Sequence, residues 1–227
     1  MDAPRPHVIV FSHDFGVRKE NRGLFTAIAR TFPGATSILF DYNPIHDKSN
    51  TLTAKPLAEQ SRKLRKVINT ARAEYPGAVI DLVCHGQGCV VAAILKPRDI
   101  RKIIMLAPPQ DVSEETLIRQ LSKPEVAIDT TTRTRISGSD GSTTVIHPEY
   151  WQSLAGVKPV KLYNRMARFT ALRLMSARSD ELLGEQKFEE LEPSVSAVTL
   201  DGNHYFTDPE SRKRVIHILQ KELALER

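Results

Sequence analysis

A repeated alternation of apolar runs with amphipathic helical segments most constrains the fold of this chain. Residues 7–12 (HVIVFS) are almost continuously apolar, as a parallel strand buried on both faces requires. Comparable runs lie at 36–41, 78–84, 103–107, 170–176 and 195–200, and helical spacing falls between them at 22–32, 53–75, 87–95 and 209–225. This order predicts a single α/β domain over residues 1–227, with a doubly wound, mostly parallel sheet of about six strands.

The alternation stops between residues 108 and 160. A helical pattern at 114–121 precedes a polar, β-branched stretch at 130–145, which is divided by Ser139-Asp140-Gly141-Ser142. An Asp-Gly turn between two such strands is typical of a hairpin. We therefore expect a helix-plus-hairpin insertion over residues 108–160.

Composition and charge exclude several classes of protein. The net charge is +5. The densest basic run, residues 62–66, lies beside apolar positions at helical spacing, which predicts the solvent-exposed face of an amphipathic helix. We therefore expect no nucleic-acid partner. No run reaches the ~20 apolar residues of a membrane span, and residues 1–6 lead into a strand without a signal-peptide pattern. We expect a cytoplasmic monomer or homodimer without membrane contact.

No metal-binding or cofactor-binding spacing is visible. Cys84 and Cys89 stand five residues apart in apolar surroundings, without the further ligands that a zinc site needs, and are interpreted as buried packing residues. No pair of histidines at helical spacing and no calcium loop is present. We expect no cofactor and no metal.

Residues 81–92 (DLVCHGQGCVVA) carry the most informative motif. A strand, a tight turn of small residues and a helix are typical of a nucleophile elbow, with Cys84 and Gly88 as the small flanking residues. A phosphate-binding loop is the alternative, but the dinucleotide fingerprint and the Lys-Ser/Thr pair are both absent. The segment resembles the elbow of the serine α/β-hydrolase superfamily, in the His-Ser-Gln-Gly form of small carboxylesterases that include cinnamoyl (feruloyl) esterases. Where that family has its serine nucleophile, this chain has Gly86.

Other parts of the same superfamily pattern follow the remaining strands. Residues 12–16 (SHDFG) resemble its oxyanion loop, with Asp14 in a place usually held by glycine; the resemblance implies that the N–H groups of Phe15 and Gln87 form the oxyanion hole. Asp180 and His204 follow the fifth and sixth strands, in the order the family requires, and are implied to be the catalytic acid and base. Glu181 and Asp201 are neighbouring competitors for the acid.

The resemblance also implies that residues 108–160 form a lid over the site. Its aromatic residues favour an ester with an acyl or aryl group over a charged substrate. The residues expected to contact substrate are His13, Asp14, His85, His147, Tyr150, Trp151 and Tyr205.

These residues predict a carboxylic ester hydrolase of the acyl-enzyme type, acting on a small-molecule ester and disabled at Gly86. The glycine is either an engineered Ser-to-Gly change or natural, and the near-complete triad favours the engineered origin, for which Gly86→Ser should restore hydrolysis at once. The alternatives are a natural pseudoenzyme, which binds a small ester, an acid or a partner without turnover, and an acyltransferase. Dehalogenase and epoxide hydrolase chemistry requires aspartate at the apex and ranks low.

Overall fold

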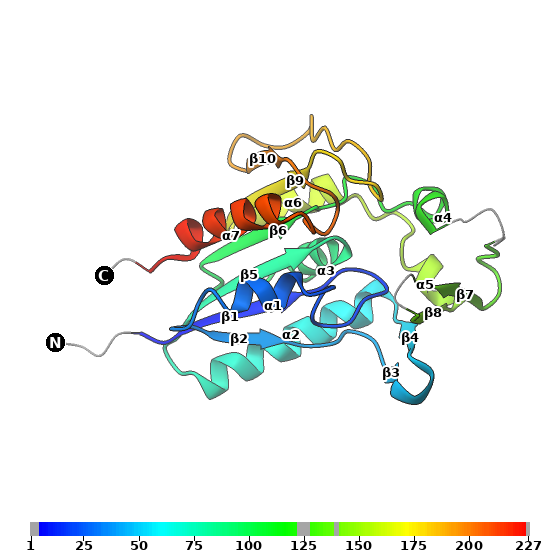
Figure 1. Cartoon of the computed structure of the whole chain (residues 1–227), viewed down its shortest axis with the longest axis horizontal. Coiled ribbons are helices and arrows are strands. Elements are labelled where there is room, and N and C mark those ends of the chain that lie inside the picture. Colours follow the sequence, from blue (N-terminus) through cyan, green and yellow to red (C-terminus); the bar gives the residue numbers. More distant parts are fainter. Residues whose placement is uncertain (1–4, 122–127, 139–140, 226–227) are drawn as a thin grey trace.

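A parallel sheet of six strands forms the centre of the protein (Figure 1). The computed structural model describes residues 5–121, 128–138 and 141–225. The spatial order of the strands is β10-β9-β6-β5-β1-β2, and each pair of neighbours is parallel. This confirms the predicted sheet. The strands are β1 (His7–Ser12), β2 (Thr36–Leu39), β5 (Val79–His85), β6 (Lys102–Leu106), β9 (Ala171–Ala177) and β10 (Ser196–Leu200).

Helices cover both faces of this sheet and create two cores. Because side chains alternate along a strand, Val8 and Val10 of β1 face one core while Ile9 and Phe11 face the other. The first core also contains residues from α2 (Leu57–Glu74), α3 (Gln87–Leu95) and α6 (Pro159–Ala167). The second contains residues from α1 (Leu24–Ala29) and α7 (Pro209–Leu223). Burial on both faces explains why the strands read as continuous apolar runs.

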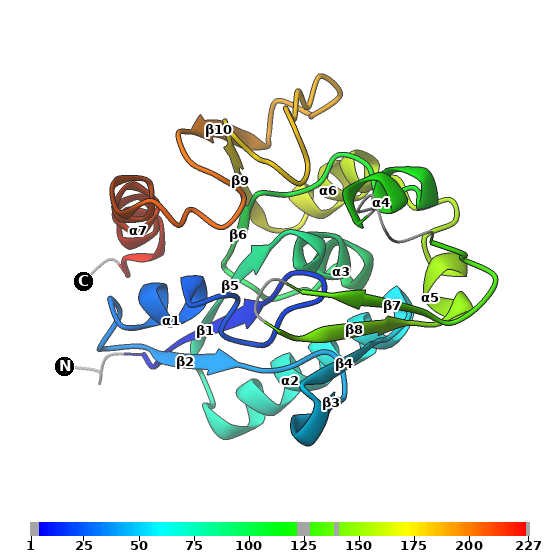
Figure 2. The ribbon, with the colours of Figure 1, turned by 45° about the vertical axis from the view of Figure 1, so that its right-hand side comes forward.

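A second, mixed sheet lies beyond the ends toward which the main strands point (Figures 1 and 2). Its order is β3-β4-β8-β7, with β4 and β8 parallel and the other pairs antiparallel. The hairpin expected within 130–145 is present as β7 and β8, although residues 139 and 140 of its turn lie outside the described residues. The strands are β3 (Ile45–His46), β4 (Thr51–Ala54), β7 (Thr134–Ser137) and β8 (Thr143–Ile146). The helices α4 (Glu114–Leu121) and α5 (Pro148–Gln152) lie on the same side of the molecule in Figure 1.

The sequence placed some boundaries incorrectly. The helix expected from residue 53 begins at Leu57, because residues 51–54 pair with the hairpin as β4 and Pro56 precedes the first turn. The helix expected over 22–32 is shorter, since Gly23 adopts a left-handed conformation in front of it. Neither β3 nor β4 was anticipated. Strands of two and four residues carry too little periodicity to be recognised without their partner.

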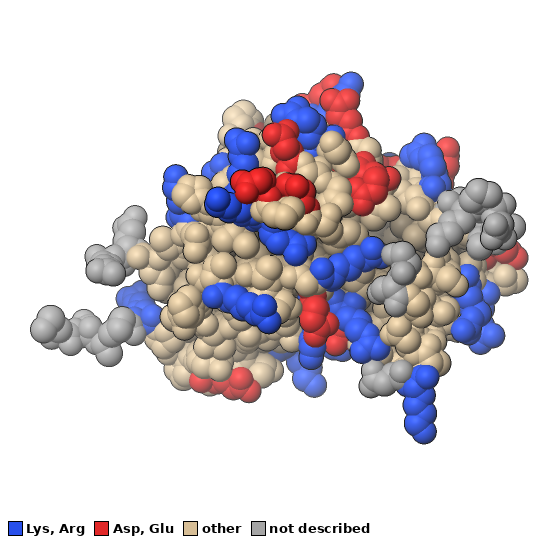
Figure 3. Space-filling view, in the orientation of Figure 1, with Lys and Arg blue, Asp and Glu red and all other residues tan. Residues whose placement is uncertain are grey.

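Charged side chains are intermixed on the surface. On the face in Figure 3, basic residues are separated by acidic and uncharged ones among the described residues. Within the described parts of the chain, every helix is too short or too polar to cross a bilayer.

Helix α3 approaches the end of β1 so closely that Gly88 leaves no room for a side chain. A Cβ at residue 88 would come closer than 3.0 Å to the carbonyl oxygens of Ser12 and His13, and both are backbone atoms that cannot move aside. The small flanking residue that the elbow pattern predicted therefore has a steric reason.

We expect Gly88→Ala to lower the free energy of unfolding by about 1–3 kcal/mol through overpacking. Gly34→Ala is the matched control, because a Cβ at residue 34 meets no atom of the described part of the chain within 4 Å. Urea denaturation of both variants measures the difference, and equal stabilities would contradict the close approach of α3 to β1.

Candidate functional site

Gly86 occupies the apex of the turn between β5 and α3. Its φ of 50° and ψ of −124° lie in a region that glycine adopts far more readily than other residues. Its N–H donates to the carbonyl of Leu106 at 3.0 Å, which fixes the turn to the neighbouring strand. The local backbone is thus that of a nucleophile elbow, without a side chain at its apex.

The side chain of Asp14 lies against the bare face of Gly86. A Cβ built on Gly86 would fall closer than 3.0 Å to both Oδ1 and Cγ of Asp14. Asp14 follows β1, the strand that neighbours β5, so both residues stand at the same edge of the sheet. The carboxylate of Asp14 therefore fills the space that a side chain at residue 86 would need.

Three donors hold this carboxylate in place. The backbone N–H of Gln87 donates to Oδ1 at 2.8 Å, and the hydroxyl of Tyr205 donates to Oδ2 at 3.0 Å. Nε2 of His204 lies 3.1 Å from Oδ2. Burial would raise the pKa of Asp14, but the hydrogen bond and charge of His204 hold that pKa well below its usual range. The N–H expected to serve an oxyanion is thus engaged by Asp14.

His204 lies between two carboxylates. Its Nδ1 is 2.8 Å from Oδ2 of Asp180, and its backbone N–H donates to Glu181 at 2.9 Å. Burial opposes a charged ring, but the hydrogen bonds to Asp14 and Asp180 prevail and raise the pKa of His204 to about 10. Both ring nitrogens therefore donate, one to each carboxylate. Of the neighbouring acids, Asp180 contacts the ring and Glu181 contacts the backbone.

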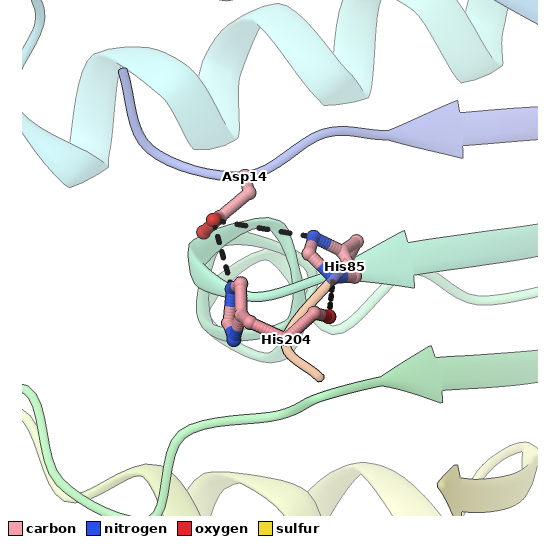
Figure 4. Close-up of side chains that lie close together, drawn as sticks. All are labelled: Asp14, His85 and His204. Carbon is pink, nitrogen blue, oxygen red and sulfur yellow. Dashed lines mark hydrogen bonds and ion pairs between the residues drawn. The ribbon is translucent and has the colours of Figure 1, made fainter. Parts of the chain in front are cut away.

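His85 completes the cluster (Figure 4). Its Nε2 lies 2.9 Å from the carbonyl oxygen of His204, which can only accept, so Nε2 carries the proton. Its Nδ1 has no hydrogen-bond partner among the described residues and lies 4.0 Å from Oδ2 of Asp14. Burial, reinforced by the nearby charge of His204, lowers the pKa of His85 to about 4. His85 is therefore a neutral ring with a free lone pair.

A cavity of about 310 Å³ opens above this cluster. Asp14, Gly86 and His204 line it, and α4 and β7 of the expected insertion contribute to its wall. Most of the other lining side chains are apolar, with Arg22, Asp111 and Glu181 as charged exceptions. The apolar lining residues include Phe15, Leu57, Val90, Val112, Leu117, Leu121, Ile136 and Leu154.

The structure brings some of the expected substrate-contacting residues to the cavity and leaves others elsewhere. Asp14, Tyr150 and Tyr205 line it, as do Phe15 and Gln87. The hydroxyl of Tyr150 donates to the side-chain carbonyl of Gln87, whose amide donates to Gln60 at 3.0 Å. Gln60, on α2, and Arg22 were not identified from the sequence, because nothing in their local pattern marks them.

Four expected residues do not line the cavity: His13, His85, His147 and Trp151. His13 is buried and structural, since its Nδ1 donates to the carbonyl of Asp14 at 2.7 Å and its Nε2 accepts from the N–H of Tyr42 at 3.0 Å. Trp151 is 2% exposed and belongs to the core. His147 precedes the first turn of α5.

The geometry sets a condition on the expectation that Gly86→Ser alone restores a serine nucleophile, because the side chain of Asp14 would first have to move. With Asp14 where it is, the new side chain would collide with the carboxylate, and the N–H of Gln87 would not be free for an oxyanion.

Removing His204 should be costly, because Asp14 and Asp180 would lose the charge that compensates them in the interior. Their side chains are 10% and 1% exposed. We expect His204→Ala to lower the free energy of unfolding at pH 7 by about 3–5 kcal/mol. His7→Ala is the matched control: it removes a histidine 2.8 Å from buried Asp81, but Arg101 still pairs with that carboxylate. Urea denaturation showing equal losses would contradict a charged His204.

Comparisons with known proteins give the fold but no closer relative. No family model and no curated protein matches the sequence. An esterase domain from Rhodothermus marinus matches with a TM-score of 0.68 at 20% identity, covering 96% of this chain and 87% of that chain. Est1E from Butyrivibrio proteoclasticus, also solved with ferulic acid bound, matches with a TM-score of 0.73 at 15% identity and coverages of 96% and 87%.

A third match is the α/β-hydrolase GrgF from Penicillium sp. sh18, with a TM-score of 0.66 at 14% identity and coverages of 97% and 91%. Together with the parallel sheet and the elbow between β5 and α3, these similarities show that the chain has the α/β-hydrolase fold.

Proposed function

We propose that this protein is a natural relative of the ester hydrolases in which the acyl-enzyme route is closed, and that its cavity binds a small, largely apolar ester without forming an acyl-enzyme. The observation that carries the proposal is the carboxylate of Asp14, which takes the place of a side chain at residue 86 and occupies the N–H of Gln87. Serine-type acyl transfer needs both of these positions.

The fit between Asp14 and Gly86 favours a natural origin over an engineered one. A single Ser-to-Gly change would have started from a protein in which the side chain of Asp14 lay elsewhere, because its present position and a side chain at residue 86 exclude one another. Asp14 and Gly86, 72 positions apart, each differ from the residue that the esterases have at that place. Their complementary fit is better explained if the two changes arose together. An acyltransferase would need the same nucleophile, so the same geometry argues against it.

The wall of the cavity supports an uncharged, apolar ligand. Leucine, isoleucine, valine and aromatic side chains form about half of its lining, and its charged groups are of both signs, with the carboxylates of Asp14 and Glu181 beside Arg22 and His204. The cavity volume of about 310 Å³ is at the lower end of the range for small-molecule sites. An acyl or aryl ester of modest size meets these requirements.

Ester hydrolysis should appear only when Asp14 and Gly86 are both changed to the residues that the esterases have. We expect the double variant Asp14→Gly/Gly86→Ser to hydrolyse p-nitrophenyl acetate and cinnamate roughly 100-fold or more faster than the unaltered protein, because it restores a nucleophile and frees the N–H of Gln87. Gly86→Ser alone should remain at the level of the unaltered protein. Initial rates of all the proteins are measured side by side.

The control is His204→Ala in the double-variant background, which should abolish the gain by removing the general base. Substantial ester turnover by the unaltered protein would refute the proposal. A gain in Gly86→Ser equal to that of the double variant would refute the steric part of it, and a folded but inactive double variant would refute descent from a serine esterase.

Binding can be tested without turnover. We expect methyl cinnamate to raise the melting temperature of the protein, because it binds the folded state alone. Leu117→Trp should remove this shift by filling the cavity, since Leu117 lines it. Leu162→Trp is the control, because this partly buried residue of α6 packs on the same core away from the cavity. A shift that survives Leu117→Trp would place the ligand elsewhere.

A further inference from the structure

Three buried side chains from separate parts of the chain converge at the cavity: Asp14 and His204 line it, and His85, the last residue of β5, lies behind them. One nitrogen of His85, one nitrogen of His204 and one oxygen of Asp14 all lie within 4.8 Å of one another. In Figure 4 the three side chains meet beyond the tips of neighbouring strands, with the carboxylate facing both rings. His85, His204 and Asp14 are 0%, 1% and 8% exposed.

The free nitrogen of His85 needs an explanation. Because Nε2 donates to the carbonyl of His204, Nδ1 presents a lone pair, and that lone pair points toward the carboxylate of Asp14 from 4.0 Å. Two electron-rich atoms facing one another in the interior repel unless a cation or a hydrogen-bond donor stands between them. The hydrogen bonds among the described residues of the site leave Nδ1 of His85 without a partner.

The remaining hydrogen bonds orient all three groups toward a common point. Nδ1 of His204 is held by Asp180 at 2.8 Å, and the outer nitrogen of His85 is held by a backbone carbonyl at 2.9 Å. Oδ1 of Asp14 accepts from the N–H of Gln87. Carboxylates and backbone carbonyls on the outer nitrogen of a histidine are the partners that fix metal-binding rings in proteins.

We propose that Asp14, His85 and His204 bind one divalent transition-metal ion, for which Zn²⁺ is the best match. Two imidazoles and one carboxylate suit this ion. Zinc bonds of about 2.0–2.2 Å place tetrahedral ligands about 3.4 Å apart. The separation of 3.1 Å between Asp14 and His204 is close to this. The 4.0 Å between Asp14 and His85 requires a closing movement of about 0.6 Å, and the ring nitrogens of His85 and His204, which lie within 4.8 Å of one another, require one of up to about 1.4 Å.

The ion would stand where the Nε2 proton of His204 now lies, so one proton leaves as the metal binds. Asp14 and His204 also line the cavity, so the coordination positions not taken by protein atoms face it. Three protein ligands with an open position are characteristic of sites that bind water or a ligand oxygen. This site goes beyond the proposed binding of an ester and does not depend on it.

The sequence could not show this site. Its ligands lie at positions 14, 85 and 204, without the short spacings that mark zinc motifs, and only the meeting of strand ends brings them together.

Equilibrium dialysis of the untagged, chelator-treated protein against Zn²⁺ tests the proposal directly, with Co²⁺ as a coloured probe of coordination. We expect one ion per chain and the visible absorption of a four-coordinate Co²⁺ site. Asp14→Asn and His85→Gln should each weaken binding about 100-fold or more, while His217→Gln, which changes an exposed histidine on α7, should leave it unchanged. Circular dichroism checks that each variant is folded.

Binding of less than one ion per five chains of the unaltered protein would overturn the proposal, whatever the variants do. Binding that survives in both folded variants, or that is lost in His217→Gln, would also overturn it by placing the ion on the surface. Should both variants unfold, X-ray absorption of the zinc-loaded protein must show two imidazole ligands, and sulfur ligands would point to Cys84 and Cys89 instead. None of these readouts uses catalysis, so failure here leaves the proposed ester binding untouched.

Discussion

The carboxylate of Asp14 against the bare face of Gly86 is the contact on which the rest of the site depends. The carboxylate occupies the N–H of Gln87 and contacts Nε2 of His204. It also leaves no room for a side chain at residue 86, which explains the glycine there. Each residue would be unfavourable without the other. Asp14 would clash with any larger residue at the elbow, and Gly86 without Asp14 would leave a gap between the N–H of Gln87 and the ring of His204.

The architecture makes such an exchange between loops feasible. Parallel strands end at one edge of the sheet, so the loops after β1, β5, β9 and β10 meet there although they are far apart in sequence. A side chain lost from one loop can be replaced in space by a side chain from the next. The second sheet stands over the same edge and forms part of the cavity wall, so the site is enclosed by segments from both halves of the chain.

The sequence was sufficient for the main sheet and for the positions of the chemistry-bearing loops. Continuous apolar runs identified the strands, and the order of Asp180 and His204 placed both beside the elbow, where the structure finds them in contact. It did not predict the contact between Asp14 and Gly86. Taken alone, Asp14 is an unusual residue in an oxyanion loop, and Gly86 is a missing nucleophile. Considered together, a lost side chain on one loop and a gained carboxylate on its neighbour predict the exchange. The role of His85 could not be foreseen, since it depends on which ring nitrogen faces a carbonyl.

The most direct test of this account is a high-resolution crystal structure of the metal-free protein near pH 7. We predict that Asp14 Oδ1 lies about 2.8 Å from the backbone nitrogen of Gln87, with Oδ2 between Tyr205 and His204 and no water against Gly86. Density for water molecules at the elbow, with the side chain of Asp14 turned into the cavity or to solvent, would contradict it.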